Sequence, residues 1–294
     1  MRHPIRLQAI LLYALLPSGF VSAQVTSDLW GKDGERWSTE SRLPDFSFAG
    51  YRCGEAALPT GKATTDVLRF GARGDGKTDC TEALRRAIAA TDRGVIQIPA
   101  GRYVLRDMIR ITKPGIVLRG AGPGRTVIFC PRNLEDVRPN MGRTTSGRRT
   151  SRYSWSGGFF QVQGNIRRDH VANMTHHVRR GSTEVKIDAP RKPLRPGQFV
   201  TIEITDDAER TLLDQMYAGE AGDTSRAPKP GVVHLANRVV SLRKNHLTLE
   251  RPLRLDLRTS WSPVVKTWEP TVTEVGIEDL TIEFPVKPYR GHFT

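Results

Sequence analysis

The sequence has 294 residues, of which 38% are apolar and 26% charged, with 27 glycines and 19 prolines. These proportions are those of a globular protein with a sizeable core, and they exclude a disordered or collagen-like chain. With 45 Lys and Arg against 31 Asp and Glu, the net charge is +14, which favours a polyanionic partner: a nucleic acid, an acidic lipid surface or an acidic polysaccharide.

The segment 1–23 has the layout of a secretory signal peptide. Arg2 and Arg6 precede the apolar run 9–16, and the small residues 21–23 follow, so that cleavage is expected before Gln24. The alternative, a membrane anchor, needs about 20 continuous apolar residues, and this run is far shorter. The sequence therefore predicts a secreted or periplasmic protein without a membrane-spanning segment.

Residues 24–62 show neither helical nor alternating periodicity and are predicted to form an extended N-terminal arm. The chain has three cysteines, Cys53, Cys80 and Cys130, so at most one disulfide can form within it. They lack the spacing of a zinc site and are expected to be small buried apolar residues. No metal site is predicted from them.

After the arm, Val67–Phe70 is predicted to be a strand, followed by a loop rich in Gly and Asp and by a helix over residues 81–91. Leu84, Ala87 and Ile88 lie on one face of that helix, and Asp79 is expected to cap it together with Glu82. This is the one convincing helix in the sequence.

Short apolar runs of β type then follow one another from residue 95 to residue 129, separated by turns rich in Pro and Gly. The spacing of about 21 residues between similar runs fits the rungs of a solenoid, in which successive coils stack parallel strands. Residues 63–180 are therefore predicted to form these coils.

A second β-rich block, residues 181–257, is predicted to be a small β subdomain inserted into the solenoid. It contains a hairpin around residues 239–249 and a polar surface insertion over residues 206–232. Residues 277–282 resume the solenoid pattern, so residues 258–294 are assigned to it. Because the last coil lacks a capping element, we expect the solenoid to be truncated there.

Residues 71–78 fit the P-loop pattern of a nucleotide-binding protein, G-x-x-x-x-G-K-[ST]. Asp75, however, places a carboxylate where a phosphate would bind, and no strand ending in a magnesium-binding Asp follows. We therefore favour a structural role, in which Asp75 and Gly76 form a tight turn before the helix.

The same region resembles the opening of pectate lyase superfamily proteins. The resemblance extends from Leu68 to Ile128 and rests on residues 68–84 with their Gly-Asp-Gly-Lys-Thr-Asp motif, residues 94–103 and residues 116–128. Cys80 stands where the family usually has a second Asp. The resemblance implies an all-β fold: a right-handed single-stranded parallel β-helix with an N-terminal capping helix and a small inserted β subdomain.

The resemblance also implies a function on carbohydrate. It points to a lyase or glycoside hydrolase acting on an acidic, uronate-containing polysaccharide. A nucleic-acid partner is disfavoured by the export signal and by the absence of a recognised nucleic-acid-binding module. A non-catalytic polysaccharide-binding or tailspike-like structural β-helix is the alternative. In this superfamily the reaction is carried out by residues on later coils, so the catalytic residues stay unknown, as does the oligomeric state.

Two groups of residues are candidates for chemistry. The first group contains acids and bases near the start of the polar insertion: Glu203, Asp206, Asp207, Arg210 and His234. Paired carboxylates serve a hydrolase, or hold calcium while an arginine removes a proton in a lyase, so calcium is a possible cofactor. The alternative is a solvated loop without chemistry.

The second group lies in residues 138–180, which hold nine arginines, no lysine and a single acid, Asp169. Guanidinium groups pair well with carboxylates and aromatic side chains lie interleaved with them. The candidate substrate-binding residues are Arg148, Arg149, Arg152, Tyr153 and Trp155. The alternative is a solvated basic loop.

The signal peptide is directly testable. If residues 21–23 are the cleavage site, the exported protein begins at Gln24, and N-terminal sequencing of secreted material will show that residue first. Mature soluble protein that retains Met1 would contradict the prediction.

Overall fold

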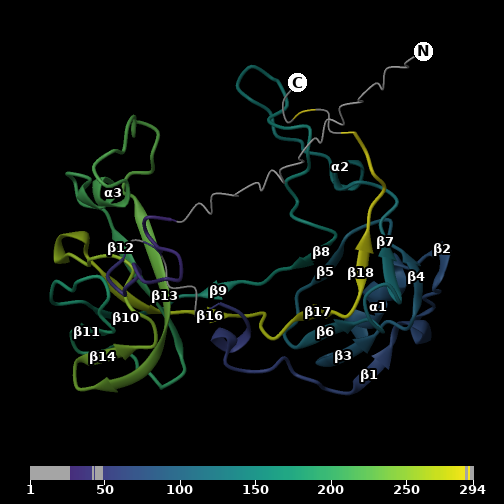
Figure 1. Ribbon diagram of the computed structural model, residues 1–294, viewed down its shortest axis with the longest axis horizontal. Coiled ribbons are helices and arrows are strands. Elements are labelled where there is room, and N and C mark those ends of the chain that lie inside the picture. Colours follow the sequence, from purple (N-terminus) through teal and green to yellow (C-terminus); the bar gives the residue numbers. More distant parts are fainter. Residues whose placement is uncertain (1–26, 42, 44–48, 289–290, 292–294) are drawn as a thin grey trace, which may run out of the picture.

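The structure is a computed structural model that describes residues 27–41, 43, 49–288 and 291. The predicted signal peptide lies outside the described residues. The chain is mostly strands with few helices. Figure 1 shows two lobes joined by a narrow connection: one contains β1 to β8 with β17 and β18, and the other contains β10 to β15. We call them the coil lobe and the sheet lobe.

The coil lobe contains two parallel sheets. The first sheet contains β1 (Ala63–Asp66), β3 (Gly94–Gln97), β6 (Ile116–Arg119) and β17 (Gly276–Glu278), in that order. The second contains β2 (Asp75–Asp79), β4 (Gly101–Val104), β7 (Thr126–Phe129) and β18 (Thr281–Glu283). A third parallel pair joins β5 (Ile109–Ile111) to β8 (Phe160–Val162). Consecutive strands thus fall in different sheets, and each coil pairs in parallel with the next.

The strands of this region pair in parallel at long spacings. Gly94 pairs with Ile116 in the first sheet, and Gly101 pairs with Thr126 in the second. The first spacing is close to the period that the sequence predicts, and the second is longer. Alternate side chains point into the coil, where Ile96, Ile116 and Leu118 are fully buried.

Helix α1 (Thr81–Ala90) covers the first coil. Leu84 and Ala87 are fully buried and Ile88 is 6% exposed, as the helical periodicity predicts. The start of the helix differs from the expected capping box. The Asp79 carboxylate accepts hydrogen bonds from the amide and hydroxyl of Thr81, but Glu82 forms an ion pair with Arg85 instead of returning to the backbone.

The expected strand Val67–Phe70 is wrong. These residues form a 3-10 helix, and the strand β1 comes directly before it. The Asp66 carboxylate accepts the amide of Leu68 at 2.7 Å, and Gly71 ends the turn with a φ of 88°. The local hydrogen bond that the Asp66 carboxylate accepts thus overrides the β propensity of the apolar run 67–70. The segment expected to be a loop instead contributes β2.

The structure also explains the P-loop pattern. The Asp75 carboxylate accepts the amides of Lys77 and Thr78 and the hydroxyl of Thr78, all within 2.8 Å. These bonds from Thr78 and Lys77 lower the pKa of Asp75 to about 2. The amides that would bind a phosphate in a P-loop are therefore engaged by a carboxylate, and the turn is structural.

The sheet lobe is built on an antiparallel sheet. Its order is β10 (His170–Asn173), β15 (Val264–Thr267), β12 (Phe199–Thr205), β13 (Val232–Arg243), β14 (His246–Leu249) and β11 (Glu184–Lys186). The hairpin of β13 and β14 has the expected turn. The sheet is wider than the expected segment 181–257, since β10 and β15 lie outside that range. The strands β10 and β15 have no strong sequence pattern of their own. They join the sheet because neighbouring strands bury Val171 and Val265.

Two shorter helices complete the fold: α2 (Leu134–Val137) in the coil lobe and α3 (Thr211–Met216) in the sheet lobe. The sheet lobe has its own core, in which Trp261 is fully buried and Val200, Ile202 and Ile204 lie on one face of β12. The fully buried Trp261 donates its Nε1 hydrogen to the Thr211 hydroxyl.

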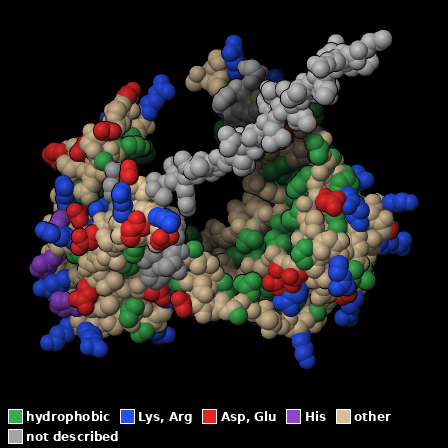
Figure 2. All heavy atoms as spheres, in the orientation of Figure 1, with side chains coloured by type: hydrophobic (Ala, Val, Ile, Leu, Met, Phe, Trp, Pro, Cys, Tyr) green, Lys and Arg blue, Asp and Glu red, His purple; other side chains and the backbone are tan. Residues whose placement is uncertain are grey.

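The two lobes are joined by a short antiparallel pair, β9 (Ile166–Arg167) with β16 (Glu269–Pro270). The chain leaves the coil lobe after β8, builds the sheet lobe and returns, so that β17 pairs with β6 and β18 with β7. Residues 277–282 do resume the parallel coils. Hydrophobic side chains gather on the exposed end of the coil lobe (Figure 2), where Ile282 and Phe284 are 40% and 53% exposed.

All three cysteines are free. Cys80 and Cys130 are fully buried, as expected, and burial raises the pKa of Cys130 to about 12. Cys53 is half-buried and lies between the lobes. No helix among the described residues is long and apolar enough to cross a bilayer.

The buried face of α1 gives a stability prediction. Ile88→Asp places an unpaired charge against the coil core and should lower the free energy of unfolding by about 3 kcal/mol or more. Lys77→Ala, an exposed change on the adjacent turn, is the matched control and should leave unfolding nearly unchanged. Urea denaturation of the two variants measures this. Equal stability of both variants, or ATP binding lost in Lys77→Ala, would contradict the structural role of the motif.

Candidate functional site

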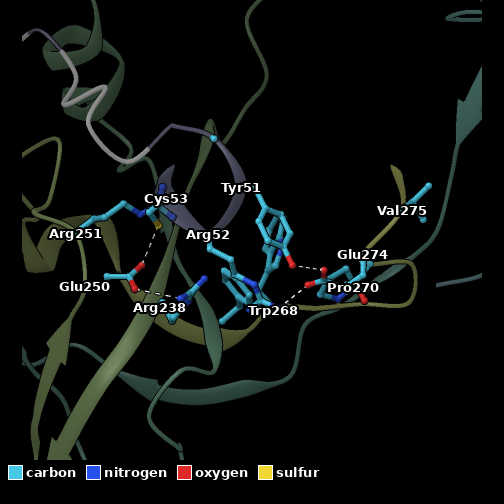
Figure 3. A pocket seen from close by; sticks show the side chains of 13 residues that line it. Tyr51, Arg52, Cys53, Arg238, Glu250, Arg251, Trp268, Pro270, Glu274 and Val275 are labelled. Atoms are coloured by element: carbon cyan, nitrogen blue, oxygen red, sulfur yellow. Dashed lines mark hydrogen bonds and ion pairs between the residues drawn. The ribbon is translucent and has the colours of Figure 1, made fainter. Parts of the chain in front are cut away.

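A cavity of about 470 Å³ opens between the two lobes. Figure 3 shows that its side chains come from distant parts of the sequence and face one another across the gap. The lining residues come from the turn before the coil lobe, from the sheet lobe and from the connection: Gly50, Tyr51, Arg52, Cys53, Phe199, Arg238, Glu250, Arg251, Trp268, Pro270, Thr273, Glu274 and Val275. We call this cavity the inter-lobe pocket.

One wall of the inter-lobe pocket is held by Glu274. Its carboxylate accepts the Tyr51 hydroxyl at 2.8 Å and the Arg52 guanidinium at 2.6 Å (Figure 3). The backbone of Arg52 and Cys53 is left-handed, with φ of 49° and 60°, a conformation that costs energy for residues other than glycine. The two bonds to Glu274 help to keep this turn against the connection between the lobes.

The opposite wall belongs to the sheet lobe. The Arg238 guanidinium lies 4.7 Å above the Phe199 ring and pairs with Glu250 at 3.2 Å. The Cys53 thiol approaches the other oxygen of Glu250 at 3.7 Å. Figure 3 shows Arg251 beside this group. Cation–π and charge-assisted contacts thus fix Arg238 at the pocket surface.

Two polar atoms of this wall lack partners. Within the described residues, the Nε atoms of Arg238 and Arg251 are buried and have no hydrogen-bond partner. Buried N–H groups are almost always paired in native proteins, and leaving one unpaired costs free energy. These two Nε atoms are enclosed by the protein, whereas the side chains of Arg238 and Arg251 line the cavity, where guanidinium groups are suited to a carboxylate of a bound molecule.

Aromatic faces complete the pocket. Trp268 stands on the connection with Arg168 at 4.5 Å from its ring centre, and Tyr51 faces it from the other wall (Figure 3). Guanidinium groups pair with carboxylates and aromatic faces pack on the apolar faces of rings. Chemically, the inter-lobe pocket can bind a ring that carries an acidic group.

The candidates at the start of the polar insertion do come together. Asp206, Asp207 and Arg210 line a cavity of about 300 Å³ beside Pro230. The two carboxylates, however, are engaged at the start of α3, and Arg210 donates to Thr224. Asp206 accepts the amide of Leu212, and both oxygens of Asp207 are bonded to Thr211, which lowers the pKa of Asp207.

This group does not fit calcium. Calcium takes six to eight oxygen ligands, whereas oxygens of both carboxylates already accept N–H and O–H donors, and the Arg210 cation lines the same cavity. More generally, no three His, Cys, Asp or Glu side chains in the described part of the chain are grouped so that they could hold a metal ion.

Glu203 and His234 lie side by side on neighbouring strands, as paired residues of β12 and β13. Glu203 forms an ion pair with Lys266 at 2.6 Å, and the His234 Nδ1 atom lies 3.7 Å from its other oxygen. The sequence did not single out Lys266, because it belongs to a strand much further along the chain.

The arginine-rich segment 138–180 is divided by the fold. Arg148, Arg149, Arg152, Tyr153 and Trp155 lie between α2 and β8 in the coil lobe. Arg149 pairs with Glu135 at 3.5 Å, and Trp155 is 64% exposed. The later arginines lie in the connection and the sheet lobe. Among them, the Arg168 guanidinium lies over the Trp268 ring. The net charge of the segment therefore does not form one surface.

Part of the chain matches a known family. Residues 64–188 match the family described as "Rhamnogalacturonase A/epimerase, pectate lyase-like". This match confirms the resemblance seen in the sequence.

Two curated proteins are similar to parts of the chain. Alginate lyase 7 of Azotobacter vinelandii is 34% identical over 100 residues, which is 31% of this chain and 12% of that protein. A polygalacturonase of Prunus persica is 44% identical over 50 residues, which is 16% of this chain and 13% of that protein. The chain thus spans about an eighth of the length of these relatives.

Among solved structures, the chain is similar to two phage tailspikes. The tailspike gp61 of Pseudomonas phage phi297 aligns with 76% of this chain and 35% of its own, at 15% identity and a TM-score of 0.46. The Gp54 tailspike of Acinetobacter baumannii bacteriophage AP22, solved with a capsular saccharide, aligns with 74% and 31% at 11% identity and a TM-score of 0.42.

The Glu274 contacts predict a change in protease sensitivity. Glu274→Ala removes both bonds that hold the turn, so limited trypsin digestion should cut after Arg52 several times faster than in the wild type. Glu269→Ala is the matched control, because Glu269 pairs with Arg167 in the same connection without touching the turn. Identical cleavage after Arg52 in both variants would mean that Glu274 does not hold this wall.

Proposed function

We propose that this is an exported protein that acts on an acidic, uronate-containing polysaccharide, as a lyase or a glycoside hydrolase, and binds the polymer in the inter-lobe pocket. In this proposal the coil lobe is the beginning of a right-handed parallel β-helix. The two-sheet parallel pairing of the coils and the single covering helix α1 support that assignment.

The pectate lyase-like portion supports the substrate class. The curated relatives are named for alginate and polygalacturonate, both of which are polymers of acidic sugars. Because the shared length is short, the reaction of those proteins is a hypothesis for this chain. The net charge of +14 adds a general attraction for polyanions.

The observation that carries the proposal is the pair of arginine side chains that line the inter-lobe pocket beside aromatic rings. Arg238 and Arg251 offer guanidinium groups, Trp268 and Tyr51 offer ring faces, and the cavity is large enough for a sugar. A carboxylate accepts such donors with the geometry that arginine favours. A neutral sugar would offer these guanidinium groups no charged acceptor.

A non-catalytic binder is the second candidate, and a specific observation favours it. The pocket's two acids are both held by cations: Glu250 by Arg238, and Glu274 by Arg52. Each of these carboxylates is thus already engaged by a guanidinium group. Chemistry in the pocket would need one of these pairs to open.

The test is binding and turnover with the whole chain. Alginate and polygalacturonate should bind, with affinity that falls as salt rises because charge pairs are screened over about 8 Å at physiological ionic strength. A neutral glycan should bind poorly, and DNA of matched charge density should bind more weakly than the polyuronate at moderate salt. Unsaturated products absorbing in the ultraviolet would indicate a lyase, and new reducing ends a hydrolase.

Variants locate the binding surface. Trp268→Ala should weaken polyuronate binding several-fold, whereas replacing Arg148, Arg149 and Arg152 together by Ser should change it little at moderate salt. If the triple variant abolishes binding and Trp268→Ala does not, the binding surface is the loop of the coil lobe. Equal or stronger DNA binding would contradict a sugar site, and polyuronate binding without either product would favour the non-catalytic alternative.

A further inference from the structure

We propose that the polymer path continues from the inter-lobe pocket past Arg251 into a second cavity, which forms a further subsite for a uronate carboxylate. The inference rests on the proposed function and adds the position and chemistry of a second binding unit. It explains why Arg251 borders two cavities at once.

The second cavity has a volume of about 270 Å³ and is lined by residues 234–237 of β13 and by residues 251–254. The inter-lobe pocket contains Arg238 and Arg251. The two cavities are therefore consecutive along β13 and share Arg251. At about 3.4 Å per strand residue, the path from Arg238 to His234 is roughly 14 Å, which is longer than a single sugar ring.

The shared arginine is fixed in place. The Arg251 amide donates to Asn237 Oδ1 at 3.0 Å, and the Asn237 side-chain amide donates back to the Arg251 carbonyl at 2.8 Å. The guanidinium donates to the Ala236 carbonyl at 3.2 Å, while its Nε lacks a partner among the described residues. Arg251 is thus anchored at its backbone and at its guanidinium group, and it lines both cavities.

The second cavity also has a lining that suits an acidic ligand. Arg251 and Arg254 line it, His234 stands at one end, and no Asp or Glu is among its described lining residues. The inter-lobe pocket, by contrast, contains Glu250 and Glu274. Leu235, Pro252 and Leu253 supply apolar surface for the faces of a ring. These groups together match a carboxylated sugar.

The test compares ligands of different length. In this proposal a uronate disaccharide occupies the inter-lobe pocket alone, whereas a uronate hexasaccharide reaches both cavities. The wild type should therefore bind the hexasaccharide more tightly. Arg254→Gln should weaken hexasaccharide binding about two- to fivefold, the range for an exposed charge contact, and leave disaccharide binding unchanged. Titration calorimetry at fixed salt measures both affinities.

Controls separate this subsite from general charge. Arg243→Gln removes an exposed cation at the far end of β13 and should not alter the ratio of the two affinities. Arg254→Lys keeps the charge and should restore part of the loss. Methyl esterification of the hexasaccharide should remove its advantage over the disaccharide. Melting curves of the variants verify that they fold.

The outcomes distinguish the two proposals. If Arg254→Gln leaves hexasaccharide binding unchanged while Trp268→Ala weakens both ligands, the second subsite is wrong and the proposed function stands. If Arg254→Gln and Arg243→Gln weaken both ligands equally, the effect is general charge and the subsite is again wrong. Failure of the wild type to bind either oligouronate would overturn both proposals.

Discussion

The structure depends on the return of the chain to the coil lobe after it has built the sheet lobe. The amides of Gly120, Gly122 and Cys130 donate to carbonyls of residues 278–283, which follow the whole sheet lobe in the sequence. Arg119 reinforces this contact by pairing with Glu278 and by donating to the carbonyls of Pro59 and Gly61. Because both ends of the insertion are fixed to one stack, the connection that carries Trp268 and Glu274 is positioned as well.

This constraint explains how much of the fold the sequence predicts. The strands from residue 94 to residue 129, helix α1 and the resumed coils were predicted because apolar alternation and turn residues are local signals. Val67–Phe70 was mispredicted because a single Asp66 hydrogen bond decides its conformation. The sheet of the sheet lobe extends beyond the expected segment because β10 pairs with β15. These two strands are far apart in the sequence, and neither has a local pattern that indicates the other.

The candidate site was beyond sequence reasoning for the same reason. The inter-lobe pocket takes residues from the turn at 50–53, from three places in the sheet lobe and from the connection, and none of these short segments has a motif. The expected candidates had local signals, namely neighbouring acids and a run of arginines. The structure uses Asp206 and Asp207 to start α3, and it divides the arginines between the lobes. A single residue such as Trp268 can be assigned to the pocket only when the positions of both lobes are known.

The central claim is that an acidic sugar binds between the lobes against Arg238, Arg251 and Trp268. A crystal structure of the whole chain soaked with a uronate hexasaccharide tests it most directly. The account predicts sugar density in the inter-lobe pocket, with a carboxylate within hydrogen-bond distance of the guanidinium group of Arg238 or Arg251. Density over Arg148 and Trp155 in the coil lobe, with the inter-lobe pocket free of sugar, would contradict it.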